Sequence, residues 1–208
     1  MESFDRKKHW ENIYQTKELT EVSWFQPTPE TSLGFIQETG VLKNDKIIDI
    51  GGGDSFLVDH LLDLGYQDIS VLDISEAAID RAKKRLGERA KLVKWLVSDI
   101  TNFCPTEKYD CWHDRAAFHF LTDKKEVSKY VQIAKDNITQ NGSLIIGTFS
   151  DNGPKKCSGI PIQQYTRKEL EKLFSNSFQK IACKTIDHKT PFDTIQNFVF
   201  CSFKSIAQ

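Results

Sequence analysis

Short apolar runs alternate with helix-like segments along much of this chain, from residue 46 to residue 149. In the helix-like segments the apolar residues recur every three or four positions, which is the repeat of an amphipathic helix. Strands that alternate with helices form βαβ units, which place parallel strands in one sheet with helices on both faces. The predicted strands cover residues 46–50, 69–73, 91–97, 109–112 and 143–149, and the predicted helices between them cover residues 55–64, 76–86 and 125–138.

The last part of the chain changes this pattern. A helix is predicted over residues 167–174, and two apolar runs with no helix between them follow at about 179–188 and 194–204. Two consecutive strands indicate an antiparallel hairpin. The predicted fold class is therefore α/β, with a doubly wound, mostly parallel sheet of seven strands that ends in a C-terminal antiparallel hairpin.

The composition argues against several classes of protein. Hydrophobic residues make up 39% and charged residues 27% of the chain, which fits a soluble globular protein. The formal net charge is −1, so no overall field attracts nucleic acid or an anionic membrane. No apolar stretch is long enough to cross a membrane, and the first fifteen residues are too charged for a signal peptide. We therefore expect a cytoplasmic protein that binds neither nucleic acid nor membrane.

The cysteine pattern bears on the compartment. The five cysteines are odd in number, widely spaced and without a CxxC pair. This pattern argues against a disulfide framework and against a structural zinc site, so no metal ligands are predicted. A reducing compartment is the simplest interpretation.

A glycine-rich loop, Asp49-Ile-Gly-Gly-Gly-Asp-Ser55, connects the first predicted strand of the sheet to a helix. Glycines there allow a tight turn and a close approach of the backbone to a ligand. Asp73, twenty residues past Gly53, ends the next strand and could accept hydrogen bonds from two ribose hydroxyls. Asp99 follows the third strand, where it could accept the adenine amine while Ile100 lies against the ring.

Two kinds of ligand compete for this loop. A dinucleotide fingerprint needs a third glycine where this chain has Phe56. Asp49, two residues before the first glycine, adds negative charge and suits a cationic ligand better than a pyrophosphate. The loop therefore favours an adenosyl ligand without phosphates, and an NAD-dependent oxidoreductase remains a distant alternative.

The segments DIGGGDS, VLDIS, SDI and DCWHD, in this order and spacing, resemble the class I (seven-β-strand, Rossmann-like) S-adenosylmethionine-dependent methyltransferases. The resemblance implies that Gly51 and Gly53 pass the methionyl part of the cofactor and that Asp49 helps to hold its ammonium group. It also implies that Asp73 binds the ribose, Ile74 the face of the adenine and Asp99 its amine. Asp54-Ser55 departs from the family pattern, which often has a third glycine there, and Asp54 is either a cofactor contact or a helix cap.

The N-terminal segment carries a second resemblance. Trp10, Tyr14 and the pair Trp24-Phe25 are similar to a branch that includes eukaryotic protein-lysine methyltransferases. In that branch the segment folds over the cofactor, where an aromatic lid excludes water and can lie against the sulfonium. The alternative is that Trp10 and Tyr14 only pack a helix, predicted over residues 5–16, onto the sheet. A second helix is predicted over residues 30–40.

We predict one methyltransferase domain over residues 1–208, because this length fits a single domain. Residues 1–40 form its helical lid segment and residues 41–208 its Rossmann-like core. A long irregular segment, 150–166, carries two glycines and two prolines and is typical of a lid or binding loop.

The stretch DCWHDRAAFHFL places ionisable residues after the fourth strand, which we expect to end at Trp112 or His113. Asp114 and Arg115 would then lie at the carboxyl edge of the sheet, beside the sulfonium. By resemblance to the Asp-Lys-Gly pattern of the lysine methyltransferases, Asp114 faces the methyl donor or the nucleophile. Arg115 could bind a carboxylate or phosphate of the substrate, or form a structural ion pair.

Two histidines and a cysteine complete the set of candidates. His119 lies near the place of an acid in the lysine-methyltransferase pattern and could act as a base, or it could be a buried histidine bonded to backbone or Asp114. His113 is structural or a cofactor contact. Cys157 could face the substrate from the segment 150–166, although a lone cysteine is usually inert.

The predicted function is transfer of a methyl group from S-adenosyl-L-methionine to a small-molecule acceptor by in-line displacement. Such a reaction needs alignment and a dry site more than acid–base groups. The alternatives are a protein-lysine methyltransferase and a non-catalytic adenosyl-binding partner protein. The expected partner is a small-molecule or protein substrate, and the expected oligomeric state is a monomer.

Overall fold

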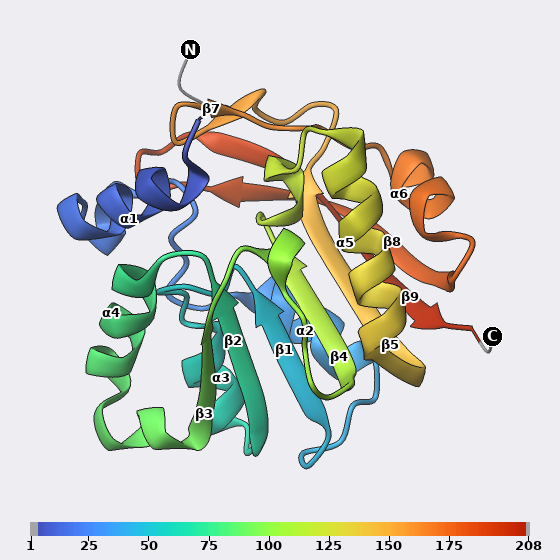
Figure 1. The fold of residues 1–208 in the computed structure, drawn as a ribbon. Helices are drawn as coiled ribbons and strands as arrows, with labels where there is room; N and C mark the ends of the chain where they lie inside the picture. Colours follow the sequence, from blue (N-terminus) through green and yellow to red (C-terminus); the bar gives the residue numbers. More distant parts are fainter. Residues whose placement is uncertain (1–3, 207–208) are drawn as a thin grey trace.

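The computed structural model describes residues 4–206, and its centre is a sheet of seven strands in the order β3-β2-β1-β4-β5-β9-β8 (Figure 1). β1 to β5 pair in parallel, and β9 runs antiparallel to both β5 and β8. The predicted α/β class and the C-terminal hairpin are therefore confirmed. The strands are β1 Lys46–Ile50, β2 Asp68–Asp73, β3 Val93–Val97, β4 Tyr109–Arg115, β5 Ile138–Phe149, β8 Phe178–Lys189 and β9 Ile195–Ser205.

Helices cover both faces of this sheet (Figure 1). One apolar core joins the sheet to α5 and α6, and a second core on the other face joins it to α2, α3 and α4. The helices are α1 Arg6–Thr16, α2 Glu30–Glu38, α3 Leu57–Asp63, α4 Glu76–Leu86, α5 Lys124–Asn137 and α6 Arg167–Phe174. Short 3-10 turns are η1 Leu19–Glu21, η2 Gly87–Leu92, η3 Ile100–Asn102 and η4 Phe118–Phe120. None of the helices in residues 4–206 is long and apolar enough to cross a membrane.

Local capping signals explain why two helices begin where the sequence predicts. The Ser75 hydroxyl accepts a hydrogen bond from the Ala78 N–H at the start of α4, and Gly87, with φ +57°, ends that helix. Thr166 and Glu169 form a capping box at the start of α6. In both cases the capping residue lies within a few positions of the helix end, so the end can be predicted from the local sequence alone.

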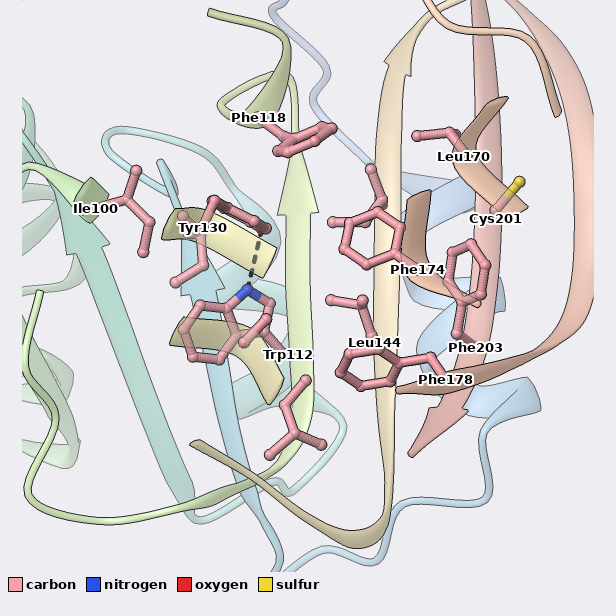
Figure 2. Close-up of a cluster of buried hydrophobic side chains, with 14 of the residues drawn as sticks. Ile100, Trp112, Phe118, Tyr130, Leu144, Leu170, Phe174, Phe178, Cys201 and Phe203 are labelled. Atoms are coloured by element: carbon pink, nitrogen blue, oxygen red, sulfur yellow. Dashed lines mark hydrogen bonds between the residues drawn. The ribbon is translucent and has the colours of Figure 1, made fainter. Parts of the chain in front are cut away.

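The core beside α5 contains a polar link. The Trp112 Nε1–H donates to the Tyr130 Oη over 3.1 Å (Figure 2), and both side chains have no exposed surface. The Phe118 ring lies 4.8 Å from the Tyr130 ring. This link fixes the end of β4 against α5, and the candidate site begins at that end.

The pairing of β4 with β5 contains an irregularity. Tyr109 pairs with Ile138, but Cys111 pairs with Ser143, so β5 carries extra residues between the two pairs. Asn141, with φ +61°, lies in this bulge. The fifth strand, predicted over residues 143–149, is therefore longer and contains a bulge.

The structure corrects the interpretation of the cysteines. Cys183 and Cys201 lie opposite each other on β8 and β9, with Cα atoms 4.1 Å apart, and form a disulfide. The two residues are separated by 18 positions, and only the strand register brings them together. The cysteine pattern therefore no longer supports a reducing compartment. Cys104, Cys111 and Cys157 are free thiols.

The segment 150–166 is partly ordered by two short strands, β6 Lys156–Cys157 and β7 Ile160–Pro161, which pair with each other. Cys157 and Tyr165 are buried, so the segment packs on the sheet edge. It therefore forms one wall of the cavity described next.

Candidate functional site

A cavity opens at the carboxyl ends of β1, β2 and β4, and encloses about 1110 Å³ of space including its mouth. The loops after β1, β2, β3 and β4 form its floor. The N-terminal segment supplies Arg6, Trp10, Tyr14 and Trp24, and the far wall carries Cys157 and residues of β9. In an open α/β sheet this edge is where ligands bind.

The glycine loop, residues 51–53, forms a tight turn, called the glycine cradle below, in which a side chain would clash with its neighbours. A Cβ on Gly51, which has φ +67°, would lie 2.6 Å from the Cβ of Ala117. A Cβ on Gly53, with φ +43°, would lie 2.7 Å from Asp73 Oδ2 and 3.0 Å from the Tyr14 hydroxyl. Both positions therefore need glycine. Gly51 lines the cavity, whereas Gly53 packs behind it against Asp73 and Tyr14.

Asp49 lines the cavity and is joined to a buried histidine. Its Oδ1 lies 2.7 Å from His113 Nδ1, and His113 Nε2 lies 2.9 Å from the Ser32 hydroxyl. An ionised carboxylate only accepts hydrogen bonds, so Nδ1–H donates to Asp49 and Nε2 accepts from Ser32 in the neutral ring. Both nitrogens of His113 are therefore occupied, and the ring orients Asp49.

Asp73 presents a carboxylate to the cavity. Its Oδ1 accepts from the Ser75 N–H over 2.8 Å, while Oδ2 lies beside Gly53. Burial, supported by the nearby charges of Asp49 and Glu11, raises the pKa of Asp73 to about 7. The carboxylate therefore has acceptor capacity for hydroxyl donors from a ligand, and Ile74 lines the cavity next to it.

Asp99 also lines the cavity but is already engaged. Its Oδ1 accepts from the N–H and the hydroxyl of Thr101, each over 2.8 Å, and its Oδ2 pairs with Arg6 Nη1 over 3.2 Å. A carboxylate has about four acceptor positions, so roughly one remains for a ligand amine. Ile100, which is buried, lines the cavity beside it.

The aromatic residues of the N-terminal segment cover the cavity. The Trp10 ring meets Trp24 edge-on at 5.7 Å and Phe120 at 4.9 Å. Burial raises the pKa of Tyr14 well above its usual range, so its hydroxyl stays protonated. Trp10, Tyr14 and Trp24 all line the cavity, so they do more than pack a helix onto the sheet.

Polar contacts hold α1 in this place above the ends of β2 and β3 (Figure 1). Glu11 accepts from the Ser75 hydroxyl over 2.8 Å and from the Ala77 N–H over 3.2 Å at the start of α4. Arg81 of α4 donates to the backbone oxygens of Tyr14 and Lys17. These contacts link the aromatic residues to the element that follows Asp73.

Asp114 is placed differently from the prediction. Its Oδ1 accepts from the Ala117 and Phe118 N–H groups, each over 3.0 Å, and its Oδ2 accepts from the Tyr130 hydroxyl over 2.8 Å. The side chain has no exposed surface and is absent from the cavity lining, and burial raises its pKa to about 6. Its carboxylate faces α5, so it does not reach the position expected for the methyl donor.

His119 is likewise a packed residue and not a base in the cavity. Its Nδ1 accepts from the Phe149 N–H over 3.3 Å, and its ring lies against Phe120 and Phe149. Burial and the charge of Arg115 lower its pKa to about 3. It is fully buried and outside the cavity lining, as the alternative of a backbone-bonded histidine describes.

Asp54 is paired with two arginines of α4. It is therefore neither a helix cap nor a residue of the cavity lining. Its Oδ2 lies 2.9 Å from Arg81 Nε, and its Oδ1 accepts from Arg85 Nη1. Burial nevertheless raises its pKa. The local turn uses Ser55 instead, whose hydroxyl accepts from the Leu57 N–H over 3.1 Å.

Several residues that the sequence did not single out line the same cavity. Phe149, Gln196 and Phe198 come from β5 and β9, and Ser32 comes from α2. Arg115, which the sequence did identify, lies among them, and so does Cys157. No local motif marks these residues, because they meet only through the pairing of β5 with β9.

Comparison with known proteins agrees with this geometry. Residues 42–199 match the family model described as a methyltransferase domain. The mouse eEF1A lysine and N-terminal methyltransferase is 32% identical over 127 residues, which cover 60% of this chain but 18% of that protein. A malonyl-[acyl-carrier protein] O-methyltransferase of Ilyobacter polytropus is 24% identical over 94% of this chain and 78% of its own length.

Solved structures agree in fold. The N-methyltransferase NodS from Bradyrhizobium japonicum, in complex with S-adenosyl-L-homocysteine, superposes with a TM-score of 0.76 at 14% identity. That match covers 97% of this chain and 99% of NodS.

The fold and the cavity define an α/β protein of the class I methyltransferase type. The match over residues 42–199 shows that the chain belongs to the methyltransferase domain family. The prediction of a class I methyltransferase, the kind that uses S-adenosylmethionine, is confirmed at the level of the family.

Proposed function

We propose that this chain transfers a methyl group from S-adenosyl-L-methionine to a small-molecule acceptor. The observation that carries the proposal is the carboxylate of Asp73, which lies between the glycine cradle and the aromatic cover with acceptor capacity to spare. Two neighbouring ribose hydroxyls are donors of the kind that this position can take.

The same cavity offers contacts for the rest of the cofactor. Gly51 lines the cavity where we place the methionyl chain, Gly53 supports the turn from behind, and Asp49 supplies negative charge for the ammonium group. Ile74 and Ile100 supply apolar surface for the adenine, and Asp99 keeps one acceptor position for its amine. We propose these residues as the cofactor contacts, with Trp10, Tyr14 and Trp24 as the cover.

When bound, the cofactor supplies a methyl group on a sulfonium, so that one bond to the acceptor forms as the carbon–sulfur bond breaks and its electron pair stays on sulfur. The residues of this chain align the two partners and exclude water. Apart from the carboxylates that we assign to the cofactor, the cavity residues within the described range offer little basicity. Burial raises the pKa of Cys157 to about 11, His113 has both nitrogens engaged, and Tyr14 is protonated.

This lack of a base restricts the acceptor atom. A hydroxyl would need a base to remove its proton in the transfer step. A carboxylate, a thiolate or a neutral amine or ring nitrogen needs none. We therefore propose an acceptor atom of that second kind, with any proton it carries released to solvent.

A protein-lysine methyltransferase is the second candidate, and the similarity to the eEF1A lysine and N-terminal methyltransferase favours it. The position of Asp114 weighs against it, because the acid of the Asp-Lys-Gly pattern is turned towards α5 here. A non-catalytic adenosyl-binding protein is the third candidate.

Calorimetry with S-adenosylhomocysteine and NAD tests the cofactor. We expect the first to bind and the second not to, and Asp73→Ala should weaken binding by about 1–3 kcal/mol. Asp63→Ala, which removes an exposed carboxylate of α3, is the control and should leave affinity unchanged. Failure of the wild-type chain to bind S-adenosylhomocysteine would refute the proposal.

Labelled-methyl transfer in cell extract distinguishes the three candidates. Label in the small-molecule fraction supports the first, and label in protein supports the second. Cofactor binding without any labelled product supports the third. A cytoplasmic location and a monomeric state stay predictions, to be checked by fractionation and by light scattering.

A further inference from the structure

Arg115 is a cation that lines the cavity and forms no ion pair with an acidic side chain of residues 4–206. Its Nη1 donates to the backbone oxygen of Trp24 over 3.1 Å, and its guanidinium carbon lies 5.5 Å from the centre of the Phe198 ring. Its Nη2 is shielded from solvent and has no hydrogen-bond partner among residues 4–206. Within the same range, no carboxylate lies within ion-pair distance of this side chain, which sets it apart from the other arginine of the cavity, Arg6.

A shielded charge without an ion-pair partner is costly, and burial lowers the pKa of Arg115 to about 10 although the nearby charge of Asp49 opposes this shift. Arg6 shows the usual solution, because it pairs with both Asp99 and Glu126. The residue after Arg115 is strained as well, since Ala116 has φ +67° and lines the cavity. Strain and unpaired charge at one position are typical of a site that a ligand completes.

A second polar atom without a partner lies nearby in the lining. Gln196 Oε1 is shielded and has no hydrogen-bond partner in the described part of the chain. Gln196 and Phe198 are two positions apart on β9 and therefore point to the same side of the strand. Both line the cavity with Phe149, so the polar atoms sit against aromatic walls.

We propose that Arg115 binds a carboxylate group of the methyl acceptor, so that the acceptor is a small carboxylic acid with an apolar body. Gln196 Oε1 can only accept, so it would take a donor group elsewhere on the same molecule. This inference rests on the proposed methyl transfer. One free arm of one guanidinium matches the single charge of a carboxylate. A phosphate group carries more charge and three acceptor oxygens, which one arm does not satisfy.

The cofactor has a carboxylate of its own, and the arrangement of strands argues for the acceptor. Asp73 ends β2 and Asp99 follows β3, and both strands lie on one side of β1 in the sheet order. Arg115 ends β4, on the other side, and its ring contact is with Phe198 on β9. The free arm of Arg115 therefore belongs to the half of the cavity beyond the glycine loop.

The first test uses acetate as the probe and acetamide as its uncharged counterpart, at constant ionic strength, with and without saturating S-adenosylhomocysteine. A change in tryptophan fluorescence reports binding, since Trp24 lines the cavity and its backbone oxygen accepts from Arg115. Acetate should bind saturably and acetamide should not. Arg115→Gln should weaken acetate binding roughly tenfold to a hundredfold, as expected for a charge-assisted hydrogen bond. Arg115→Lys should lose less, and Arg167→Gln on the exposed start of α6 should lose nothing.

Equal effects of acetate and acetamide, or an unchanged acetate affinity in Arg115→Gln, overturn the proposal. Calorimetry with S-adenosylhomocysteine and 5′-methylthioadenosine separates the two sources of a carboxylate. If Arg115→Gln weakens the first tenfold and leaves the second unchanged, Arg115 holds the cofactor, and the proposal is wrong. If the wild-type chain binds neither compound, the proposed function fails, while the acetate test without cofactor stands by itself.

A labelling experiment connects the site to the acceptor. Passing cell extract over an anion exchanger at pH 9 should remove the acceptor, so that labelled-methyl transfer falls at least tenfold. Passing it over a cation exchanger should not. Undiminished labelling after anion exchange overturns the proposal. Circular dichroism checks that each variant is folded. If Arg115→Gln does not fold, the comparison of Arg115→Lys with the wild-type chain replaces it.

Discussion

The ionised carboxylate of Asp73 faces the cavity, and its burial should lower the free energy of unfolding of this chain at neutral pH. Burial raises its pKa to about 7, compared with 3.8 for an ordinary aspartate. A group with a raised folded-state pKa binds more protons in the folded state, so the free energy of unfolding falls as pH rises from about 4 to 7. At 1.36 kcal/mol per pKa unit, the ionised group costs on the order of 4 kcal/mol above pH 7 and less than half of that at pH 5.

The perturbation that tests this is Asp73→Asn, because an asparagine oxygen can still accept from the Ser75 N–H. The variant should gain about 2–3 kcal/mol more stability at pH 8 than at pH 5, relative to the wild-type chain. Urea unfolding at both pH values measures this, provided that the slope with denaturant does not change. Asp63→Asn on the exposed surface should show no such difference. An equal effect at both pH values would falsify the assignment of the raised pKa to Asp73.

The same variant should lose affinity for S-adenosylhomocysteine, because an amide NH₂ would face donors where the wild-type carboxylate accepts. Affinity of the wild-type chain should rise as pH increases towards 7 and then level off, since binding favours the ionised carboxylate. The Asn variant should lack this pH dependence. A gain in stability together with a loss of binding would show that Asp73 serves ligand binding and not the stability of the fold.

Three further changes test the packing around the site. Asp54→Ala leaves two half-buried arginines without their shared carboxylate, although Arg85 keeps Asp59, and should cost about 1–3 kcal/mol in urea unfolding; a loss below roughly 0.5 kcal/mol would contradict a structural ion pair. Asp114→Ala removes the acceptor for two N–H groups and the Tyr130 hydroxyl, and should cost about 1–3 kcal/mol while the pH profile of labelled transfer keeps its shape. Cys183→Ser opens a loop with a sequence separation of 18 and should cost about 3 kcal/mol in oxidised protein, with no difference from wild type after reduction.

The sequence was sufficient for the sheet because its evidence is local. Each strand and helix carries its own apolar repeat, and Ser75, Gly87 and Thr166 mark helix ends within a few residues. Asp49, Asp73 and Asp99 could be located because each lies at the end of a strand or within two residues of it. The disulfide could not, because the register of β8 with β9 depends on packing along the whole hairpin.

The assignment of Asp114 failed for a different reason, which concerns where β4 ends. With a strand that stops at Trp112 or His113, both Asp114 and Arg115 would lie in a loop and could turn into the cavity. The strand runs to Arg115, so side chains keep alternating between the two faces up to the last residue. His113 and Arg115 therefore line the cavity, while Trp112 and Asp114 face α5.

That alternation gives one strand two roles. Trp112 and Asp114 both bond the hydroxyl of Tyr130, over 3.1 Å and 2.8 Å, and Figure 2 shows the first of these contacts between β4 and α5. Asp114 also holds the N–H of Ala117, the residue whose Cβ closes against Gly51 in the glycine cradle. The buried face of β4 thus fixes the turn that shapes the cofactor side of the cavity. On its other face, Arg115 lines the cavity and points away from Asp114, whose carboxylate accepts from Ala117, Phe118 and Tyr130.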